Sequence, residues 1–323
     1  METAMKSFAK ACILSWVFIG IALGGYASGA SSEIRTSDPY TLQVFPREDS
    51  RQKDAETGVD LLYLSNGKSK DINLYFHQRS WLFDGSLVLF TSAREQGGLM
   101  GYIVETGELV RITAADGRPT GRATAATGRN SVFAMADDDL LEIALTITVS
   151  GEGDARHAAV QAVERRLNTI PGVDTYINES CDARYIAASG ASLIDGKAGI
   201  KLIRESDGAV ETLCALPEGL TYAGHLQWSI TNPNWLSFAA HPQRLWVVDI
   251  RDKTPFCPYR QKEGELITHE SWWVDDQLMF CGGEHTNPGE QSSLKVLNIR
   301  TGVVRIVGEG SWMADSSPDE VAH

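Results

Sequence analysis

Short runs of alternating apolar and polar residues, separated by turn-forming residues, cover most of the chain beyond residue 56. Alternation with a period of two is typical of strands with one buried face, and clusters of Gly, Asp, Asn and Pro mark turns. The clearest runs are Asp60–Leu64, Leu87–Thr91, Leu141–Val149, Trp235–Ala239, Leu245–Ile250 and Leu278–Cys281. The composition of Ala158–Leu167 would also suit a helix, but its position in the repeat described next favours a strand and a turn. The pattern predicts an all-β protein.

A turn of the form Thr-Gly or Asp-Gly, followed by a short strand, recurs along the chain. It occurs at Thr57-Gly58, Thr106-Gly107, Asp207-Gly208 and Thr301-Gly302, with Ile170-Pro171-Gly172 and Arg251-Asp252-Lys253 as degenerate members. The spacings correspond to one, two and two units of about 50 residues, a period that is typical of β-propeller blades with four short strands each. A β-sandwich with coincidental turns is the alternative, but a sandwich needs no long repeat.

The repeat predicts five blades and the start of a sixth, near Ser311-Trp312. The expected second strands of the five blades are Leu87–Phe90, Ser131–Met135, Arg184–Ala187, Trp235–Phe238 and Leu278–Phe280. Propellers usually close by pairing an N-terminal strand into the last blade, and Gly58–Leu64 is predicted to be that outer strand. Because its blade is incomplete, the chain is expected to be truncated at its C-terminus. Closure with five blades is the alternative, and it leaves the last dozen residues without a role.

The first 30 residues are predicted to be a signal peptide. Lys6 and Lys10 precede the apolar stretch Ala11–Leu23, and Ser28 and Ala30 are suitably placed for cleavage. A retained signal anchor is the alternative, but the apolar run is short for a bilayer span. We therefore expect a periplasmic or secreted protein with no membrane attachment after cleavage, a leader over residues 31–56 and a propeller domain over 57–323. Four cysteines would reach the oxidising compartment, and their spacing does not decide among three pairings.

Composition and charge narrow the function. The chain of 323 residues is 43% hydrophobic, which excludes a disordered protein, and its 42 Asp and Glu against 29 Lys and Arg give a net charge of −13. Such a surplus of acid argues against a nucleic-acid partner. A polyanionic substrate would have to meet a local concentration of Arg, Lys or metal, because the field of the whole protein repels it.

Three histidines precede a tryptophan at the same place in the repeat, just before the expected innermost strand. They are His77 in His77-Gln78-Arg79-Ser80-Trp81, His225 in Gly224-His225-Leu226-Gln227-Trp228 and His269 in Thr268-His269-Glu270-Ser271-Trp272. Equivalent positions in successive blades converge on one mouth of the central channel, so His225 and His269 are expected to approach each other. Hydrogen bonding between blades is the structural alternative for each of them.

The same segments carry a resemblance to a known family. Leu74-Tyr75-Phe76 through Asp84-Gly85, the run Gly224–Ser229 with Asn232-Pro233-Asn234, and Ile267–Trp273 resemble the oligogalacturonate lyase family of seven-bladed propellers. The similarity extends over roughly residues 54 to 323, and the two motifs around His225 and His269 are its most specific part. It implies β-elimination on short pectic oligogalacturonates, which gives a 4,5-unsaturated uronate.

The resemblance also implies roles for individual residues. His225 would be the base that removes the C5 proton, and Mn²⁺ or another divalent cation would bind the uronate carboxylate. His269 would be the first metal ligand and His323 the second, with Glu320 at the position where the family has glutamine. The third histidine of the family motif is absent. An imidazole suits proton abstraction near neutral pH, and a divalent cation stabilises the carboxylate charge that develops.

Several assignments depend on the residue types alone. Arg204 and Lys201, with Arg184 as a further candidate, are the cations expected to hold a second uronate, although most such side chains are simply solvated. Glu270 is expected to support His269. The alternative function is a non-catalytic periplasmic propeller similar to TolB, which would bind a protein or another ligand without a convergent histidine cluster. A hydrolase that uses paired carboxylates is a weaker alternative, and no G-x-S-x-G motif supports an esterase.

Overall fold

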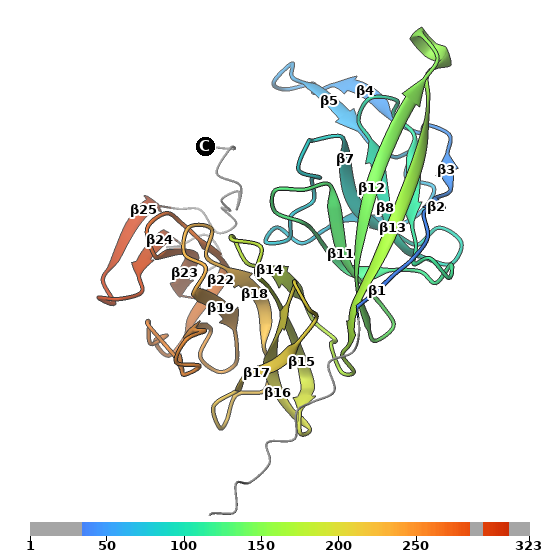
Figure 1. Ribbon diagram of the computed structural model, residues 1–323. Coiled ribbons are helices and arrows are strands. Elements are labelled where there is room, and N and C mark those ends of the chain that lie inside the picture. Colours follow the sequence, from blue (N-terminus) through green and yellow to red (C-terminus); the bar gives the residue numbers. More distant parts are fainter. Residues whose placement is uncertain (1–33, 285–292, 310–323) are drawn as a thin grey trace, which may run out of the picture. The chain divides into compact units, whose positions relative to one another are not determined.

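The computed structural model describes residues 34–284 and 293–309, and these residues form almost only β-strands (Figure 1). The exception is the single 3₁₀ turn η1 (Gly153–Ala155). Within these two ranges, no helix has the length and apolar character that a membrane crossing requires. The predicted signal peptide and its alternative, a signal anchor, lie outside the described residues. The all-β prediction is confirmed.

Five antiparallel sheets follow one another along the chain, each built mainly from four consecutive strands paired in chain order. The first consists of β6 (Asp71–Asn73), β7 (Leu87–Ser92), β8 (Gly98–Ile103) and β9 (Leu109–Ile112), and the second of β10 (Gly121–Ala125), β11 (Ser131–Ala136), β12 (Asp139–Ser150) and β13 (His157–Thr169). The third consists of β14 (Ile177–Glu179), β15 (Tyr185–Ile194), β16 (Lys197–Arg204) and β17 (Val210–Ala215). The fourth consists of β18 (Gly224–Trp228), β19 (Trp235–Ala239), β20 (Leu245–Asp249) and β21 (Pro255–Phe256), and the fifth of β22 (Glu265–Trp272), β23 (Gln277–Glu284), β24 (Ser293–Asn298) and β25 (Val304–Glu309). The five predicted second strands are β7, β11, β15, β19 and β23.

One backbone turn joins the third and fourth strands in four of the five sheets. The N–H of Gly107, Gly208, Lys253 or Gly302 donates to the carbonyl oxygen four residues earlier at 2.8, 2.8, 2.8 and 2.9 Å. All four residues have positive φ, between 59° and 75°. Glycine adopts this conformation at no steric cost, which explains why it recurs in three of these turns. The repeat interpretation is confirmed, including Lys253 in a degenerate turn.

The second sheet lacks this turn because its outer strands extend well beyond the others. Strands β12 and β13 have 12 and 13 residues and pair from Asp139↔Thr169 to Ser150↔His157. The long hairpin is visible in green in Figure 1. The segment Ala158–Leu167 is strand over its whole length, with the following turn at Pro171 and Gly172. Its repeat position therefore identified it correctly as a strand, although the turn comes later than expected.

Residues 31–56 differ from the predicted loose leader. Strands β1 (Arg35–Thr36) and β2 (Tyr40–Thr41) pair with β13, and β3 (Val44–Phe45) pairs with β9. Leu42 lies between these strands and is only 3% exposed. Two-residue strands are too short to produce a visible alternation, and their stability comes from the sheets on which they lie. The expectation of a leader is corrected for this part of the chain.

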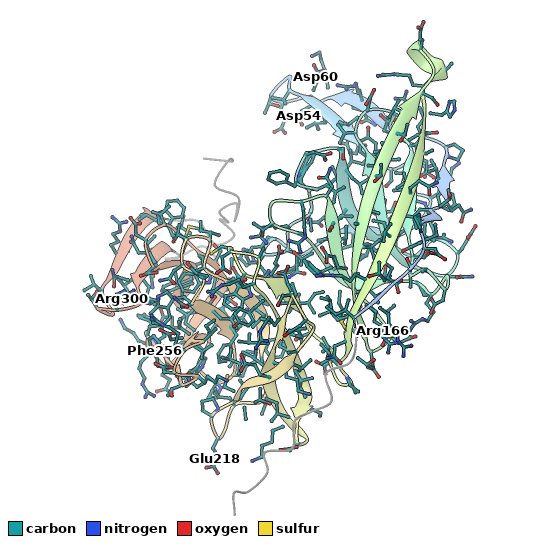
Figure 2. The ribbon with its side chains drawn as sticks, in the orientation of Figure 1. Asp54, Asp60, Arg166, Glu218, Phe256 and Arg300 are labelled. Carbon is teal, nitrogen blue, oxygen red and sulfur yellow. The ribbon has the colours of Figure 1, made fainter. Side chains whose placement is uncertain are left out.

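The predicted outer strand Gly58–Leu64 forms β5 (Asp60–Tyr63), but its partner is β4 (Ser50–Lys53). The Gly58 N–H donates to the Asp54 carbonyl at 2.9 Å with a φ of 73°, which is the geometry of the repeated turn. Figure 2 labels Asp54 and Asp60 on this hairpin. Within the described residues the hairpin is a separate two-stranded sheet. Its pairing into a last blade is therefore not what the structure shows, whereas its turn resembles the outer half of a blade.

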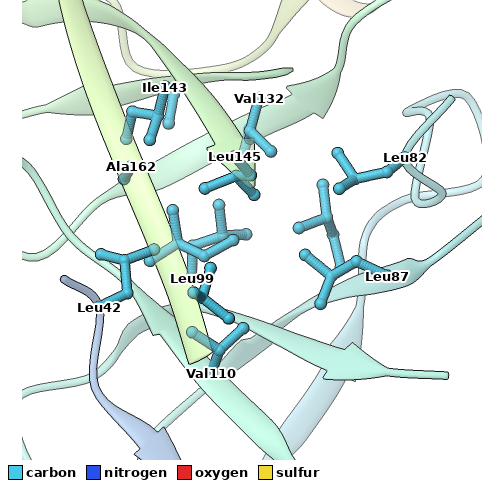
Figure 3. Packing of buried hydrophobic residues seen from close by; sticks show 14 of the residues in the cluster. Leu42, Leu82, Leu87, Leu99, Val110, Val132, Ile143, Leu145 and Ala162 are labelled. Carbon is cyan, nitrogen blue, oxygen red and sulfur yellow. The ribbon is translucent and has the colours of Figure 1, made fainter. Parts of the chain in front are cut away.

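The hydrophobic cores lie between neighbouring sheets. Leu87 and Leu99 of the first sheet pack with Val132, Ile143 and Leu145 of the second (Figure 3). Other clusters join the second sheet to the third, the third to the fourth and the fourth to the fifth. Full burial of one such aliphatic or aromatic side chain contributes about 1.5–3 kcal/mol. Each sheet is therefore stabilised by its neighbours in the chain order.

A buried ion-pair network also joins the second and third sheets. The guanidinium of Arg129 lies 2.7 Å from Glu142, 3.1 Å from Glu179 and 2.7 Å from Glu205, and Arg165 lies 2.7 Å from Glu142. The Glu179 side chain is fully buried and also accepts from the Thr127 N–H. Burial, followed by the nearby Glu179, raises the pKa of Glu205 to about 8. Arg79 adds a third cation, at 3.6 Å from Glu179, so the raised pKa of Glu205 follows from burial and from its closeness to Glu179 rather than from a shortage of cations.

This raised pKa predicts that the stability of the protein falls with rising pH. The folded state retains a proton on Glu205 that the unfolded chain releases above its ordinary pKa of 4.5. The stabilisation is therefore complete below about pH 4.5 and is lost as the pH rises through about 8. Urea unfolding across this window should show a decline in the free energy of unfolding of a few kcal/mol, which Glu205→Gln reduces. An unchanged decline in Glu205→Gln would contradict the assignment.

Candidate functional site

The first strands of three sheets carry the same backbone irregularity. Each of these strands contains a β-bulge, in which the first strand has one residue more than the second strand with which it pairs. The bulges lie between Gly121 and Thr124, between Gly224 and Gln227, and between Thr268 and Ser271. The residue after the first of each pair has positive φ: 43° at Arg122, 47° at His225 and 52° at His269. A non-glycine residue in this region is strained by about 1 kcal/mol or more and often marks a functional position. The bulge therefore presents two histidines and an arginine from equivalent positions.

Tyr176 occupies the equivalent position just before β14 in the third sheet. It precedes Ser180 by four residues, as His225 precedes Ser229, and both serine N–H groups donate to the first residue of the next strand at 2.9 Å. The ring centroids of Tyr176 and His225 are 6.0 Å apart. The first strands β10, β14, β18 and β22 also contact one another in this order. Equivalent positions in neighbouring sheets therefore lie close together, as expected.

The first strand of the first sheet is interrupted by a loop. Asn73 pairs with Phe90 and Trp81 pairs with Val88, so the first strand advances by eight residues where the second strand advances by two. We call residues 74–80 the inner loop. The inner loop contacts the first strand of every other sheet. Two contacts are hydrogen bonds: Arg79 N–H donates to Thr124 Oγ1 of β10 at 3.3 Å, and Gln78 Nε2 donates to the Ile177 carbonyl of β14 at 3.0 Å. The other two are ring contacts, with centroids 5.3 Å apart for His77 and His225 of β18 and 5.6 Å apart for Phe76 and His269 of β22. His77 thus joins the cluster from a different backbone element, while His225 and His269 lie within their strands rather than before them.

His225 belongs to a buried charged triad with Glu270 and Arg244. Its Nδ1 lies 2.6 Å from Glu270 Oε1, and the Arg244 guanidinium contacts both Glu270 oxygens at 3.0 and 3.2 Å. Burial opposes ionisation of Glu270, but the hydrogen bond from His225 and the charge of Arg244 outweigh it, so the pKa of Glu270 is lowered. The carboxylate is therefore ionised and fixed in place, with only 2% of Glu270 exposed.

Two tautomers of the His225 ring fit these contacts. With the proton on Nε2, Nδ1 accepts a hydrogen bond from Arg244 Nη2 at 3.0 Å. With the proton on Nδ1, the ring pairs with Glu270 Oε1 at 2.6 Å, which removes the repulsion between a carboxylate oxygen and an unprotonated nitrogen. The second tautomer is the one that can act as a base. In the neutral ring Nε2 then holds the lone pair. This is the arrangement of a histidine base oriented by a carboxylate.

Aromatic side chains surround His77 and His225. The Tyr75 ring centroid lies 5.0 Å from both His77 and His225, and Tyr75 is 40% exposed. The ring centroids of Tyr176 and His77 are 4.6 Å apart. Burial raises the pKa of Tyr176 to about 12, and burial also raises the pKa of Tyr222. Both hydroxyl groups therefore stay protonated at neutral pH and can donate hydrogen bonds.

The other predicted site residues are placed differently from the triad. Arg204 pairs with Asp207 at 2.7 Å at the exposed β16–β17 turn, Arg184 pairs with Asp182, and Lys201 lies within β16 opposite Ala188. None of these three side chains is the cation that contacts His225; that cation is Arg244. Glu270 was expected to support His269, but its carboxylate lies on His225 instead. This expectation is corrected: at the β22 bulge the Glu270 side chain contacts His225, whereas the His269 ring contacts Phe76.

The predicted metal ligands are only partly described. His269 lies at the β22 bulge beside Phe76, whereas Glu320 and His323 lie outside the described residues. Within residues 34–284 and 293–309, no group of three or more His, Cys, Asp or Glu side chains is arranged to hold a metal ion. The described residues around His269 therefore do not by themselves complete the expected Mn²⁺ centre. Among the cysteines, Cys214 is a buried thiol and Cys257 Sγ donates to the Tyr259 carbonyl.

Comparison with solved structures identifies the fold. Oligogalacturonate lyase from Vibrio parahaemolyticus superposes with a TM-score of 0.64 and 15% identity over 84% of this chain and 74% of that protein. An oligogalacturonate lyase in complex with manganese gives the same TM-score and identity over 83% of this chain and 74% of its own. The fold is a β-propeller. This β-propeller also matches TolB from Acinetobacter baumannii, at a TM-score of 0.42 and 11% identity over 85% of this chain and 63% of that one.

The similarity concerns the fold alone. No protein-family model matches the chain, and no curated protein sequence matches it. At 15% identity, the shared propeller fold agrees with the predicted blades, while the activity has to be argued from the side chains of this β-propeller.

Two residues of the cluster were missed by sequence reasoning. Arg244 lies in the β19–β20 loop, and nothing in its local sequence indicates that it contacts Glu270, which is 26 residues away. Arg122 had a usable signal, because Gly121-Arg122 precedes Ser131 in the second sheet much as Gly224-His225 precedes Trp235 in the fourth. Aligning the repeats by their second strands would have placed Arg122 at the histidine position.

Proposed function

We propose that this β-propeller is an exported lyase that cleaves short uronate oligosaccharides, of the pectic oligogalacturonate class, by β-elimination. The observation that carries the proposal is the buried Glu270–His225 pair, with its Nδ1–Oε1 distance of 2.6 Å, held beside Arg244. A histidine in this state is suited to remove a weakly acidic proton. The fold similarity to oligogalacturonate lyases is consistent with this choice of substrate.

The reaction follows from the chemistry of these groups. His225 Nε2 takes the C5 proton of the uronate, the electrons of the C5–H bond form the C4=C5 double bond, and the C4–O4 bond breaks. The departing oxygen takes a proton from water or from the protonated His225. Glu270 stabilises the imidazolium that forms, and Arg244 fixes the Glu270 carboxylate. Ionised Glu270 therefore orients the base through the whole cycle.

The surroundings suit a sugar acid. Tyr75, Phe76 and Tyr176 offer aromatic faces next to the histidines, and such faces pack against the apolar side of a sugar ring. Arg122 is exposed at the bulge position equivalent to His225, in a protein whose overall charge is −13. A local cation of this kind is needed to hold a substrate carboxylate against the field of the whole protein.

A divalent cation remains part of the proposal through His269, with His323 and Glu320 as its further ligands. When bound, such an ion would neutralise charge on the substrate carboxylate. His269 lies near the base, since Phe76 contacts both rings, at 5.6 Å for His269 and 6.2 Å for His225. The described residues alone do not complete such a site, and the steps above do not depend on it.

An assay of the full chain with digalacturonate tests this function. The unsaturated product absorbs in the ultraviolet, so its formation is followed directly, with and without Mn²⁺ and with a chelator. We expect a rise in absorbance, and a chelator-sensitive rise would support the cation as well. No rise with digalacturonate or with other uronate oligomers, from protein that unfolds cooperatively, would contradict the lyase. It would leave the alternative of a propeller that binds a protein or another ligand, similar to TolB.

Arg122→Ala is predicted to weaken substrate binding and to leave the chemical step unchanged. Loss of a charge-assisted hydrogen bond costs about 1.5–3 kcal/mol, so KM should rise about tenfold or more at similar kcat. Alanine keeps the positive φ without adding bulk, so the bulge should persist. Arg51→Ala on the exposed β4 strand is the matched control, with no change expected. Equal KM values for Arg122→Ala and the control would exclude Arg122 from substrate binding.

A further inference from the structure

His77 is the buried histidine of the cluster to which the reaction above gives no role. It is 3% exposed and lies on the inner loop, where its carbonyl accepts from Asn178 Nδ2 at 3.2 Å. Its Nδ1 lies 3.4 Å from Gln78 Nε2. Its Nε2 is buried and has no hydrogen-bond partner in the described structure. Burial of a polar atom without a partner destabilises the folded state, so it requires an explanation.

The neighbours of His77 fix its protonation. Gln78 Nε2 donates to the Ile177 carbonyl at 3.0 Å, so the amide nitrogen is correctly oriented and can only donate to Nδ1. The ring proton therefore lies on Nε2. Burial, together with the charges of His225 and Arg244, holds the pKa of His77 well below its ordinary value. At neutral pH His77 is an uncharged donor.

An uncharged donor is the group that this position requires. The ring centroids of His77 and His225 are 5.3 Å apart, and His225 becomes positively charged when it takes a proton. A second imidazolium at this distance would repel the first and would oppose proton transfer. A neutral N–H stabilises negative charge on an oxygen without competing for the proton. Tyr75 contacts both rings and is 40% exposed, so binding of a ligand to the pair requires Tyr75 to move.

We propose that His77 is a substrate-binding residue whose Nε2–H donates to a carboxylate oxygen of the uronate deprotonated by His225. This inference rests on the proposed function. It adds a second functional histidine that stabilises the charge developing on the carboxylate as the C5 proton leaves. His77 would therefore act on both binding and the chemical step.

Two substitutions separate this function from packing. His77→Phe keeps the ring and removes the donor, whereas His77→Gln keeps an N–H donor on a shorter side chain. We expect kcat/KM for digalacturonate to fall about 10²-fold in His77→Phe and clearly less in His77→Gln. The pH dependence of the remaining activity should keep its shape, because His225 is unchanged. His157→Phe, on the exposed end of β13, is the matched control.

Galacturonate binding, measured by calorimetry, separates this inference from the proposed function. The monosaccharide carries only a hydroxyl group at C4, which is a poor leaving group, so wild-type protein is expected to bind it without turnover. Galacturonate binding that His77→Phe weakens at least tenfold supports His77 as the donor, even if digalacturonate is not cleaved and the lyase proposal fails. Cleavage of digalacturonate by wild type and by folded His77→Phe at equal rates, with equal galacturonate binding, would overturn the inference and leave the lyase intact. Equal losses in His77→Gln and His77→Phe would also overturn it, since packing alone would then explain both.

Discussion

His225→Ala is expected to lower kcat for digalacturonate cleavage by about 10²–10⁴-fold. Alanine removes the nitrogen that takes the C5 proton, together with the ring that Glu270 orients. His77 is uncharged, but its proton lies on Nε2 and its Nδ1 faces Gln78, so it cannot replace the base. KM should change little, because the base contributes mainly to the transition state.

The measurement is the rate of ultraviolet absorbance increase at saturating substrate, next to thermal unfolding of the same preparation. His157→Ala is the control, because that histidine is exposed and contacts only Ser150 and the Ala155 carbonyl among the described residues. It should keep the wild-type rate. A folded His225→Ala protein that retains the wild-type kcat would remove His225 as the base and, with it, the proposed mechanism. Loss of activity in both variants would point to the loss of structure instead.

The blade repeat was predictable because it rests on local chemistry. Gly107, Gly208 and Gly302 mark turns whose positive φ glycine adopts freely, so the sequence shows the same residue at the same place in each unit. The second strands were visible through their runs of β-branched and aromatic residues. The strands β1, β2 and β3 were not, because two residues carry no pattern and their pairing with β13 and β9 depends on the finished sheets.

The candidate site was predictable only where it follows the repeat. His225 and His269 lie at the same bulge, so counting along the repeat placed them together. The partners of His225 were not predictable in this way. Arg244 comes from a loop, and the inner loop crosses from the first sheet to the others. Contacts of this kind depend on the three-dimensional packing of separate units, which the periodicity of a single chain does not encode.

Arg129→Met is predicted to be the most destabilising substitution among those considered, with the free energy of unfolding lowered by about 3–5 kcal/mol near neutral pH. Methionine keeps most of the side-chain volume but leaves the Glu142 and Glu179 carboxylates, and the protonated Glu205, without their shared cation. These three carboxyl groups have 10%, 0% and 7% of their side chains exposed, so water cannot replace the lost contacts. The loss should become smaller at acidic pH, where the carboxylates take up protons and need no cation.

Arg118→Met is a close control for this prediction. Arg118 also contacts three carboxylates, at 2.8–3.0 Å, and its side chain is 34% exposed against 33% for Arg129. Its partners Asp116 and Asp137 are 57% and 77% exposed, so water solvates them when the cation is removed. The third partner, Asp139, is 10% exposed but keeps its ion pair with Arg166 at 2.7 Å. Urea unfolding should therefore show a loss of about 1 kcal/mol or less for Arg118→Met. Equal losses for the two variants would mean that burial of the carboxylates does not decide the effect, and that the Arg129 network does not hold the second and third sheets together.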